Sequence, residues 1–238
     1  MIESLFDILT SNSYPGRGIL VGTGADAQSE VIAYFIMGRS ANSRNRVFEE
    51  FGDGNLRTRA FDESKVQDPS LIIYTAVRSY GNMTVVTNGD QTDTVIGALE
   101  RGGSFREALS TRCYEPDAPN YTPRISAISH AGGYSISILK AQRPIVQVPP
   151  LCARYCFDYE RAPGQGHLIH TYAGDGDPLP SFEGEPRPVS IASTDAHSLA
   201  QNMWDALDSR NRIALFVRYT CANARDTAII NAHNGGTA

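Results

Sequence analysis

Three arginines stand close together in GRSANSRNRVFEE, directly after an apolar run that is typical of a strand. Guanidinium groups are planar, bidentate donors that match phosphate oxygens, and a loop at a strand end can direct several of them at one group. The alternative is a solvated basic turn, balanced by the two glutamates that follow. The residues expected at this anion site are Arg17 from a paired strand, Arg39, Arg44, Asn45 and Arg46.

A second polar cluster lies in CYEPDAPNYTPRISAIS, ahead of another apolar run. Its three prolines fix φ and bias the preceding residues to extended forms, which stiffens the segment. A stiff polar loop suits a binding site, and it equally suits a well-anchored surface connection. The carboxylate of Glu115 is the best candidate for a general base, while a salt bridge to Arg124 is equally compatible with the sequence. The other polar residues are Tyr114, Asp117, Asn120 and Thr122.

The stretch TNGDQTDTV crowds hydrogen-bonding groups at the end of the apolar run MTVV. A tight turn into a helix explains this composition, and so does contact with a polar ligand. In the second interpretation Asn88 and the backbone of Gly89 donate hydrogen bonds to the ligand. Thr92 or Asp93 is expected to cap the helix that follows.

The elements that must position these groups are mostly short strands. GILVG and VIAYFIM, separated by TGADAQS, predict a hairpin. Further strands are expected at SLIIYTAV, MTVVTNG, RISAIS, YSISIL, PIVQVP and RIALFVRYT. Most of them are joined by too little chain for a crossover helix, so the sheets should be largely antiparallel.

Helices are expected near both ends of the chain and in the middle. The first nine residues place four apolar side chains, including Ile2, on one helical face. TVIGALERG and FREALSTRC predict two more helices, the second with capping-box spacing between Ser104 and Glu107. A later stripe at helical spacing consists of Ala196, Leu199, Ala200, Met203, Trp204 and Leu207. The Gly- and Pro-rich residues 163–188 are expected to form a long ordered loop. Together these elements predict an α+β sandwich of two sheets covered by helices.

Composition limits the classes of function. The 238 residues, 41% of them hydrophobic, can form one domain spanning residues 1–238 with a substantial core. The net charge of −5 and pI near 5.5 argue against nucleic acid as a partner. Membrane contact is not expected, because no apolar run approaches ~20 residues. MIESLFDILT lacks the features of a signal peptide, so a cytoplasmic location is expected.

The cysteines and histidines predict no cofactor. Cys113, Cys152, Cys156 and Cys221 include no CxxC pair, so we expect reduced and mostly buried thiols. A histidine pair three residues apart, at 167 and 170, could hold a metal on a helix. The glycines around that pair argue against a helix, and we expect no metal site.

Three stretches carry a resemblance to a known family. In this order, GRSANSRNR, IIYTAVRSYGNMTVVTNGDQTDTV and YEPDAPNYTPRISA resemble the archaeal-type IMP cyclohydrolases, from about Tyr14 to about Leu139. The later GHLIHTYAGDGDPLPSFEGEP is similar to bacterial IMP cyclohydrolase-like proteins. Ala173 stands there at a position where the archaeal type often has glutamate.

The resemblance implies a fold and a reaction. The fold would be a four-layer αββα sandwich like that of N-terminal nucleophile hydrolases, without their self-processing. The reaction would close 5-formamidoimidazole-4-carboxamide ribotide (FAICAR) to inosine monophosphate (IMP), with loss of water and no cofactor. The implied partner is this nucleotide, and a homo-oligomer is compatible with the extra apolar helices.

The resemblance also implies roles for the polar residues. Glu115 would accept the carboxamide proton, Tyr74 or Tyr114 would protonate the departing hydroxyl, and Asn88 would stabilise the developing oxyanion. The implied substrate-binding residues are Arg17, Arg39, Arg44, Asn45, Arg46, Gly89, Asn120, Thr122 and Arg124.

Two other functions compete with this enzyme. A catalytically silent sensor of purine ribotides is suggested by Ala173 and the long loop. An amide hydrolase of the related fold is disfavoured, since the sequence starts Met1-Ile2 and offers no Cys, Ser or Thr nucleophile there.

Overall fold

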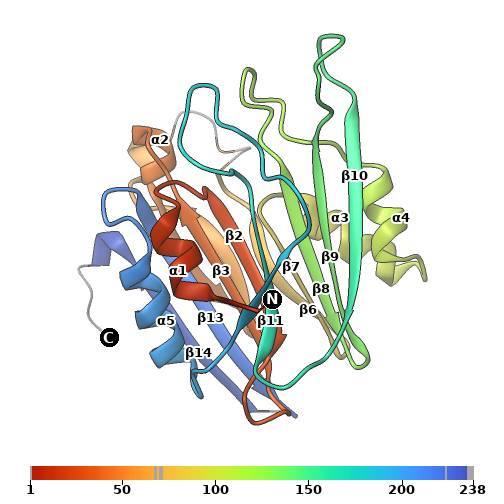
Figure 1. The fold of residues 1–238 in the computed structure, drawn as a ribbon, viewed down its shortest axis with the longest axis vertical. Helices are drawn as coiled ribbons and strands as arrows, with labels where there is room; N and C mark the ends of the chain where they lie inside the picture. Colours follow the sequence, from red (N-terminus) through yellow and green to blue (C-terminus); the bar gives the residue numbers. More distant parts are fainter. Residues whose placement is uncertain (1, 67–68, 70–71, 223, 235–238) are drawn as a thin grey trace.

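Two sheets form the centre of the molecule (Figure 1). The computed structural model describes residues 2–66, 69, 72–222 and 224–234. Within these residues the first sheet has the order β1 (Glu3–Ser4), β12 (Arg187–Ser190), β11 (Gln165–His170), β2 (Arg17–Thr23), β3 (Glu30–Met37), β13 (Arg212–Cys221) and β14 (Ala224–Asn231). The second has the order β10 (Cys152–Glu160), β9 (Gly133–Ala141), β8 (Arg124–His130), β7 (Met83–Thr87), β6 (Thr75–Tyr80), β5 (Asn55–Ala60) and β4 (Arg46–Phe51). Among these described strands, β1 and β12 form the one parallel pair, so the predicted antiparallel character is confirmed.

Helices cover the outer faces of both sheets (Figure 1). α1 (Leu5–Ser11) and α5 (Ala196–Ala206) pack their apolar faces on the first sheet. α3 (Gln91–Glu100) and α4 (Phe105–Ser110) pack on the second. The short α2 (Ala41–Arg44) and the 3₁₀ turns η1 (Glu63–Lys65) and η2 (Ala232–Asn234) lie outside these layers. The protein is therefore an α+β sandwich, as predicted.

The layer between the sheets is apolar in its middle. Tyr34 and Phe216 of the first sheet pack there with Ile125 and Val77 of the second, and all four are fully buried. The hydroxyl groups of Tyr34 and Tyr74 share one hydrogen bond of 2.6 Å across this layer. Because charged groups are costly in such a layer, those found at its two ends need a partner.

Local sequence signals place several elements correctly. β2 and β3 form the predicted hairpin, with Leu20 opposite Ala33. The predicted capping box of α4 is present, since Ser104 accepts from the Glu107 amide and Glu107 accepts from the Ser104 amide. α5 buries the predicted stripe against the first sheet.

Two predictions about helix starts are wrong. α3 begins after Asp90, whose side chain makes no capping bond, and neither Thr92 nor Asp93 is the cap. Thr92 instead bonds the Thr87 hydroxyl at 2.7 Å inside the protein. Ile2 lies before α1 and is half exposed, since β1 and not the helix occupies residues 3–4.

Several strand predictions also differ from the structure. PIVQVP forms no strand. Pro144 and Pro149 within it, and Pro150 directly after it, have no backbone N–H to donate to a neighbouring strand. It extends beyond β9 as an arm that exposes Val146 and Val148. The predicted strand SLIIYTAV begins only at Thr75, and its positions 70 and 71 lie outside the described residues. β4, β5, β10 and β14 were not predicted, and β11 occupies part of the expected loop 163–188.

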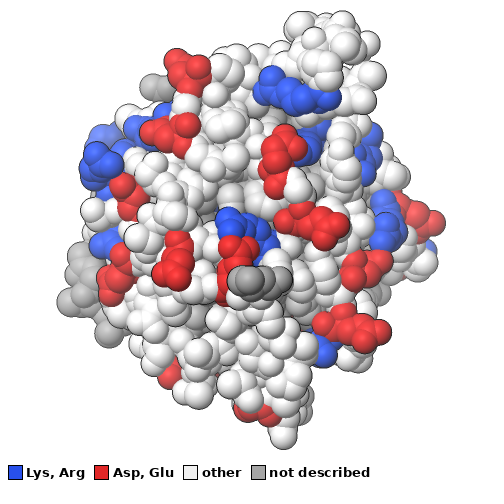
Figure 2. Space-filling model, in the orientation of Figure 1, with Lys and Arg blue, Asp and Glu red and all other residues white. Residues whose placement is uncertain are grey.

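The surface mixes both charges. Figure 2 shows blue and red side chains interspersed over this face, in keeping with the balance of 21 basic and 26 acidic residues. All four cysteines, each within the described residues, are free thiols that are exposed or half-buried, so the predicted burial is wrong. Within the described ranges, no helix is long and apolar enough to cross a membrane.

Candidate active site

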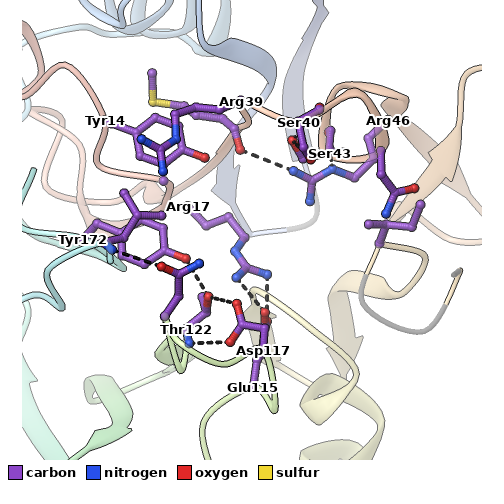
Figure 3. A pocket seen from close by; sticks show the side chains of 16 residues that line it. Tyr14, Arg17, Arg39, Ser40, Ser43, Arg46, Glu115, Asp117, Thr122 and Tyr172 are labelled. Carbon is purple, nitrogen blue, oxygen red and sulfur yellow. Dashed lines mark hydrogen bonds and ion pairs between the residues drawn. The ribbon is translucent and has the colours of Figure 1, made fainter. Parts of the chain in front are cut away.

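A polar cavity of about 360 Å³ opens at one end of the layer between the sheets, where residues of α2 contribute to its lining. Arg17 at the start of β2 and Met37 at the end of β3 form part of its wall. Other parts come from the segment 39–46, the loop 115–122 and Tyr172 after β11 (Figure 3), and the lining also includes Tyr14, Gly16, Ile72 and Leu179. Segments far apart in the chain thus contribute charged groups to one space.

One wall of the cavity is cationic and rich in hydroxyl groups. Arg46 is buried, and its guanidinium donates to the carbonyls of Ser43 at 2.7 Å and Met37 at 3.3 Å. Ser40 and Ser43 add hydroxyl groups beside it, and Asn42 lines the same wall. Within the described residues the Asn42 side-chain oxygen is buried without a hydrogen-bond partner.

Arg39 lies at the cavity mouth between an aromatic ring and a carboxylate. Its guanidinium carbon is 4.9 Å from the centre of the Tyr14 ring, which supports a cation–π contact. The same guanidinium pairs with Asp175 and donates to the Gly176 carbonyl at 3.3 Å. Arg39 and Asp175 are both about half exposed, so water and small anions reach this pair.

Arg17 and Glu115 form a buried bidentate ion pair inside the cavity (Figure 3). Arg17 Nη1 donates to Glu115 Oε1 at 2.7 Å and Nη2 donates to Oε2 at 2.9 Å. Burial opposes the charge on Arg17, but the Glu115 carboxylate outweighs it, and the pKa of Arg17 is raised well above its ordinary value. Glu115 therefore pairs with Arg17 and not with Arg124.

A hydrogen-bonded chain of two hydroxyl groups, from Tyr172 and Thr122, leads to the carboxylate of Asp117 in the same cavity. The Thr122 hydroxyl donates to Asp117, and the Tyr172 hydroxyl lies 2.5 Å from Thr122 Oγ1. Asp117 also accepts from the Thr122 amide at 2.7 Å. Burial raises the pKa of Tyr172 to about 12, so this hydroxyl keeps its proton at neutral pH.

The other residues of the loop 115–122 divide by position. Asn120 lines the cavity, and its side-chain oxygen accepts from the Leu179 amide at 3.0 Å. Tyr114 is buried elsewhere, where its hydroxyl donates to the Pro150 carbonyl at the base of the arm. Tyr74 is buried against Tyr34 and is outside the residues that form the cavity wall.

Two residues of the expected anion site lie outside the cavity. Arg44 is exposed and donates to the Arg210 carbonyl at 2.6 Å. Asn45 is buried and joins its segment to the next by two hydrogen bonds with the Asp62 backbone, each 2.7 Å long. Of the expected cluster, the structure brings Arg17, Arg39 and Arg46 together.

The stretch TNGDQTDTV builds the protein interior. Asn88 is fully buried and donates to the Pro123 carbonyl at 2.9 Å while accepting from the Ile125 amide at 2.9 Å. Arg124 ion-pairs with Asp90 at 2.7 Å and approaches Gly89 so closely that a side chain there would collide with it. The hydrogen-bonding capacity of this stretch thus ties β7 to β8, and the turn explanation fits the geometry.

Sequence reasoning missed several residues of the cavity wall. Tyr14 and Tyr172 stack on each other with ring centres 5.9 Å apart, and both face Arg39 or Thr122. Ser40 and Ser43 belong to the motif GRSANSRNR, from which only the three arginines and Asn45 were expected at the site. Tyr172 lies just after β11. The pair Thr171-Tyr172 was the sequence signal that could have identified it as a site residue.

The donor set does not resemble a metal centre. Across the described residues, no group of three or more His, Cys, Asp or Glu side chains is arranged to hold a metal ion. Arginines, hydroxyl groups and two carboxylates instead form a cavity wall whose groups can bind a small anion and transfer protons.

Comparison with known proteins identifies the family. The family model described as "IMP cyclohydrolase-like protein" matches residues 14–224. The chain is similar to the IMP cyclohydrolase of Methanopyrus kandleri, with 28% identity over 192 residues, 71% of this chain and 89% of that protein. It is 26% identical to that of Methanothrix thermoacetophila over 195 residues, 80% and 85% of the two chains. For Halobacterium salinarum the identity is 30% over 159 residues, 63% and 77%. The protein belongs to the IMP cyclohydrolase-like family, as its motifs suggested.

Proposed function

We propose that this protein is an IMP cyclohydrolase that closes FAICAR to IMP in purine biosynthesis. Family membership supports the reaction. The observation that carries the proposal is a single cavity in which a cationic wall faces both an Arg–Glu pair and a hydroxyl chain. Its volume of about 360 Å³ is within the usual range of ligand pockets.

The cationic wall is the proposed seat of the 5′-phosphate. Arg46 is held from behind by two backbone carbonyls, which leaves its charge fixed towards the cavity. Arg39 can exchange Asp175 for a phosphate oxygen, because that ion pair is exposed. Two arginines with serine hydroxyl groups match the acceptor oxygens of a phosphate ester.

Positioning supplies much of the rate for such a reaction. One C–N bond forms between the carboxamide nitrogen and the formyl carbon. Water leaves with the formyl oxygen, one carboxamide proton and one formamide proton. An amide nitrogen is a poor nucleophile, so holding it in a near-attack geometry lowers the barrier. A phosphate bound by Arg39 and Arg46 would direct the heterocyclic ring of the substrate towards Arg17 and Tyr172.

Two carboxylates can accept the carboxamide proton, and their partners differ. Both oxygens of Glu115 accept from Arg17, so Glu115 becomes a base only when that guanidinium turns away. In the alternative route, Tyr172 takes a proton from the substrate and passes its own proton to Thr122. Thr122 in turn passes its hydroxyl proton to Asp117. We assign the transfer to this chain, with Arg17 stabilising the developing oxyanion.

The remaining predicted roles belong to the same proposal. Tyr172 replaces Tyr74 and Tyr114 as the donor to the departing hydroxyl, because it faces the cavity and stays protonated. Asn88 supports catalysis indirectly, since its carbonyl accepts from Arg17 Nη1 at 3.0 Å. One domain over residues 1–238 and likeness to N-terminal nucleophile hydrolases are part of this proposal.

The activity is tested by chromatography of FAICAR after incubation with the purified protein, beside an enzyme-free blank. We expect IMP above the blank, and a rise in KM of about tenfold or more for Arg39→Gln, since a charge-assisted hydrogen bond is lost. Arg44→Gln is the matched control, because Arg44 is exposed and outside the cavity. Folded protein that binds FAICAR without turnover would instead be the purine-ribotide sensor.

The proton acceptor is tested by two isosteric changes. If the hydroxyl chain carries the proton, Asp117→Asn lowers kcat by about 100-fold or more, which is the usual contribution of general base catalysis. Glu115→Gln then lowers kcat less and leaves the shape of the pH profile intact. The reverse order of effects would return the role of base to Glu115.

A further inference from the structure

A second polar cavity, of about 510 Å³, lies at the opposite end of the layer between the sheets. β3 runs from one cavity to the other, since Glu30 at its start lines the second and Met37 at its end lines the first. The second cavity is closed by the β6–β7 hairpin on one side and by β13 and β14 on the other. Neither the motifs nor the proposed reaction uses this space.

Two arginines converge in this second cavity. A Cβ placed on Gly54 would stand 2.8 Å from Arg225 Nη1, 3.4 Å from Arg218 Nη2 and 3.4 Å from Glu50 Oε1, so both guanidinium groups reach the same point beside the Glu50 carboxylate. The Arg218 side chain is only 3% exposed, and its guanidinium carbon lies 4.8 Å from the Phe216 ring centre. Burial, opposed by Glu50 and reinforced by the charge of Arg225, lowers the pKa of Arg218.

The carboxylates paired with these arginines are exposed to water. Asp53 pairs with Arg225 at 3.2 Å and its side chain is 96% exposed, while Glu50 pairs with Arg218 at 2.8 Å and is 43% exposed. An exposed pair such as Asp53–Arg225 contributes little to stability, so another anion can replace Asp53 there. A purely structural ion pair would require neither a second arginine at the same point nor a cavity of this size.

Glu30, one of the two carboxylates that line the cavity, is already neutralised. Glu30 Oε2 accepts from the Ser129 hydroxyl and from Arg161 Nη2, the latter at 2.9 Å. Ser79, Thr84 and Thr220 also line the cavity, and their hydroxyl groups provide further donors. The cavity thus offers two converging guanidinium groups and neutral donors to an incoming anion.

We propose that this cavity is a second ligand site, in which Arg218 and Arg225 bind the phosphate group of a small phosphate monoester. The hydroxyl-lined remainder holds the polar body of that ester. Binding displaces Asp53 from Arg225 and leaves the Arg161–Glu30 pair in place. The site stands on its own residues and does not depend on the proposed cyclisation.

The site is tested by backbone amide NMR of the ¹⁵N-labelled protein during titration with adenosine 5′-monophosphate. Inorganic phosphate and adenosine in separate titrations distinguish a phosphate site from an ester site. We expect shifts of Ser79, Thr84 and Thr220 amides, which report on the second cavity, independently of Ser40 and Ser43 amides, which report on the first. Adenosine alone should leave the second-cavity amides unmoved.

Three variants decide the outcome. Arg225→Gln should raise the Kd read from the second-cavity amides by about tenfold or more, while Arg57→Gln, an exposed arginine on β5, should leave it unchanged. Asp53→Asn should lower that Kd about two- to fivefold, because it removes the competing carboxylate. If Arg225→Gln disturbs the fold, Asp53→Asn decides alone. Shifts confined to the first cavity, or a Kd indifferent to these changes, would overturn the proposal.

Discussion

The buried Arg17–Glu115 pair joins stability to function at the scale of single residues. Removing one partner leaves an uncompensated buried charge, and such changes typically cost about 3–5 kcal/mol. We expect Glu115→Gln to lower the free energy of unfolding by that amount in urea titrations, since Arg17 remains charged. Arg17→Met with Glu115→Gln should cost less than the sum of the single changes. Simple additivity would show that the pair is uncoupled.

Asp175 competes with the substrate for Arg39. Because its carboxylate already occupies the guanidinium at the cavity mouth, Asp175→Asn should lower KM for FAICAR about two- to fivefold, the equivalent of a surface ion pair. The kcat should change little, because Asp175 is remote from the hydroxyl chain. Asp177→Asn in the same loop is the matched control. A higher KM in Asp175→Asn would mean that this contact positions Arg39 for binding.

At the scale of elements, the loop 115–122 acts by holding the hydroxyl chain in place. Thr122→Val keeps the side-chain shape but breaks the link between Tyr172 and Asp117. We expect kcat to fall about 10- to 100-fold with a nearly unchanged KM, in steady-state assays. Thr122→Ser should restore most of the kcat, which a purely structural role for the methyl group would not allow. Equal losses in both variants would exclude the relay.

The sequence specified elements whose signals are local. The capping box of α4, the α5 stripe and the β2–β3 hairpin are set by residues within a few positions of one another. β4 and β10 were missed because each depends on a partner strand, and β10 is a half-exposed edge paired only with β9 among the described strands. PIVQVP has strand-like composition, but its prolines cannot join a ladder.

At the scale of the whole molecule, packing of the two sheets decides which polar residues meet. Six of the 16 residues that line the cavity were predicted from the sequence, namely Arg17, Arg39, Arg46, Glu115, Asn120 and Thr122, and all but Arg17 stood in a recognisable motif. Arg44 and Arg46 are two positions apart, yet one is exposed and the other enters the cavity. Arg44 ends the short helix α2, whereas Arg46 begins strand β4, and this change of backbone conformation directs the two side chains to different places. Tyr172 lies just after β11, a strand that the sequence analysis did not predict.

The pH dependence of stability is a property of the whole fold in which His170 stands out. This buried side chain bonds the Tyr172 carbonyl at 2.9 Å and packs edge-on against Phe182. Burial lowers its pKa from 6.5 to about 4. The unfolded chain therefore takes up a proton first as pH falls, and the folded state loses stability between pH 6.5 and 4, by about 3 kcal/mol.

Replacing His170 isolates this contribution from that of the carboxylates. His170→Asn keeps a donor for the Tyr172 carbonyl but cannot titrate, so its free energy of unfolding should fall less steeply than the wild type between pH 6.5 and 4. His197→Asn, on the exposed face of α5, should follow the wild-type curve. Parallel curves for the wild type and His170→Asn in urea titrations across this range would mean that His170 has the same pKa in the folded and the unfolded chain. The buried end of β11 would then have to accommodate a charge beside Tyr172 in the same pH range.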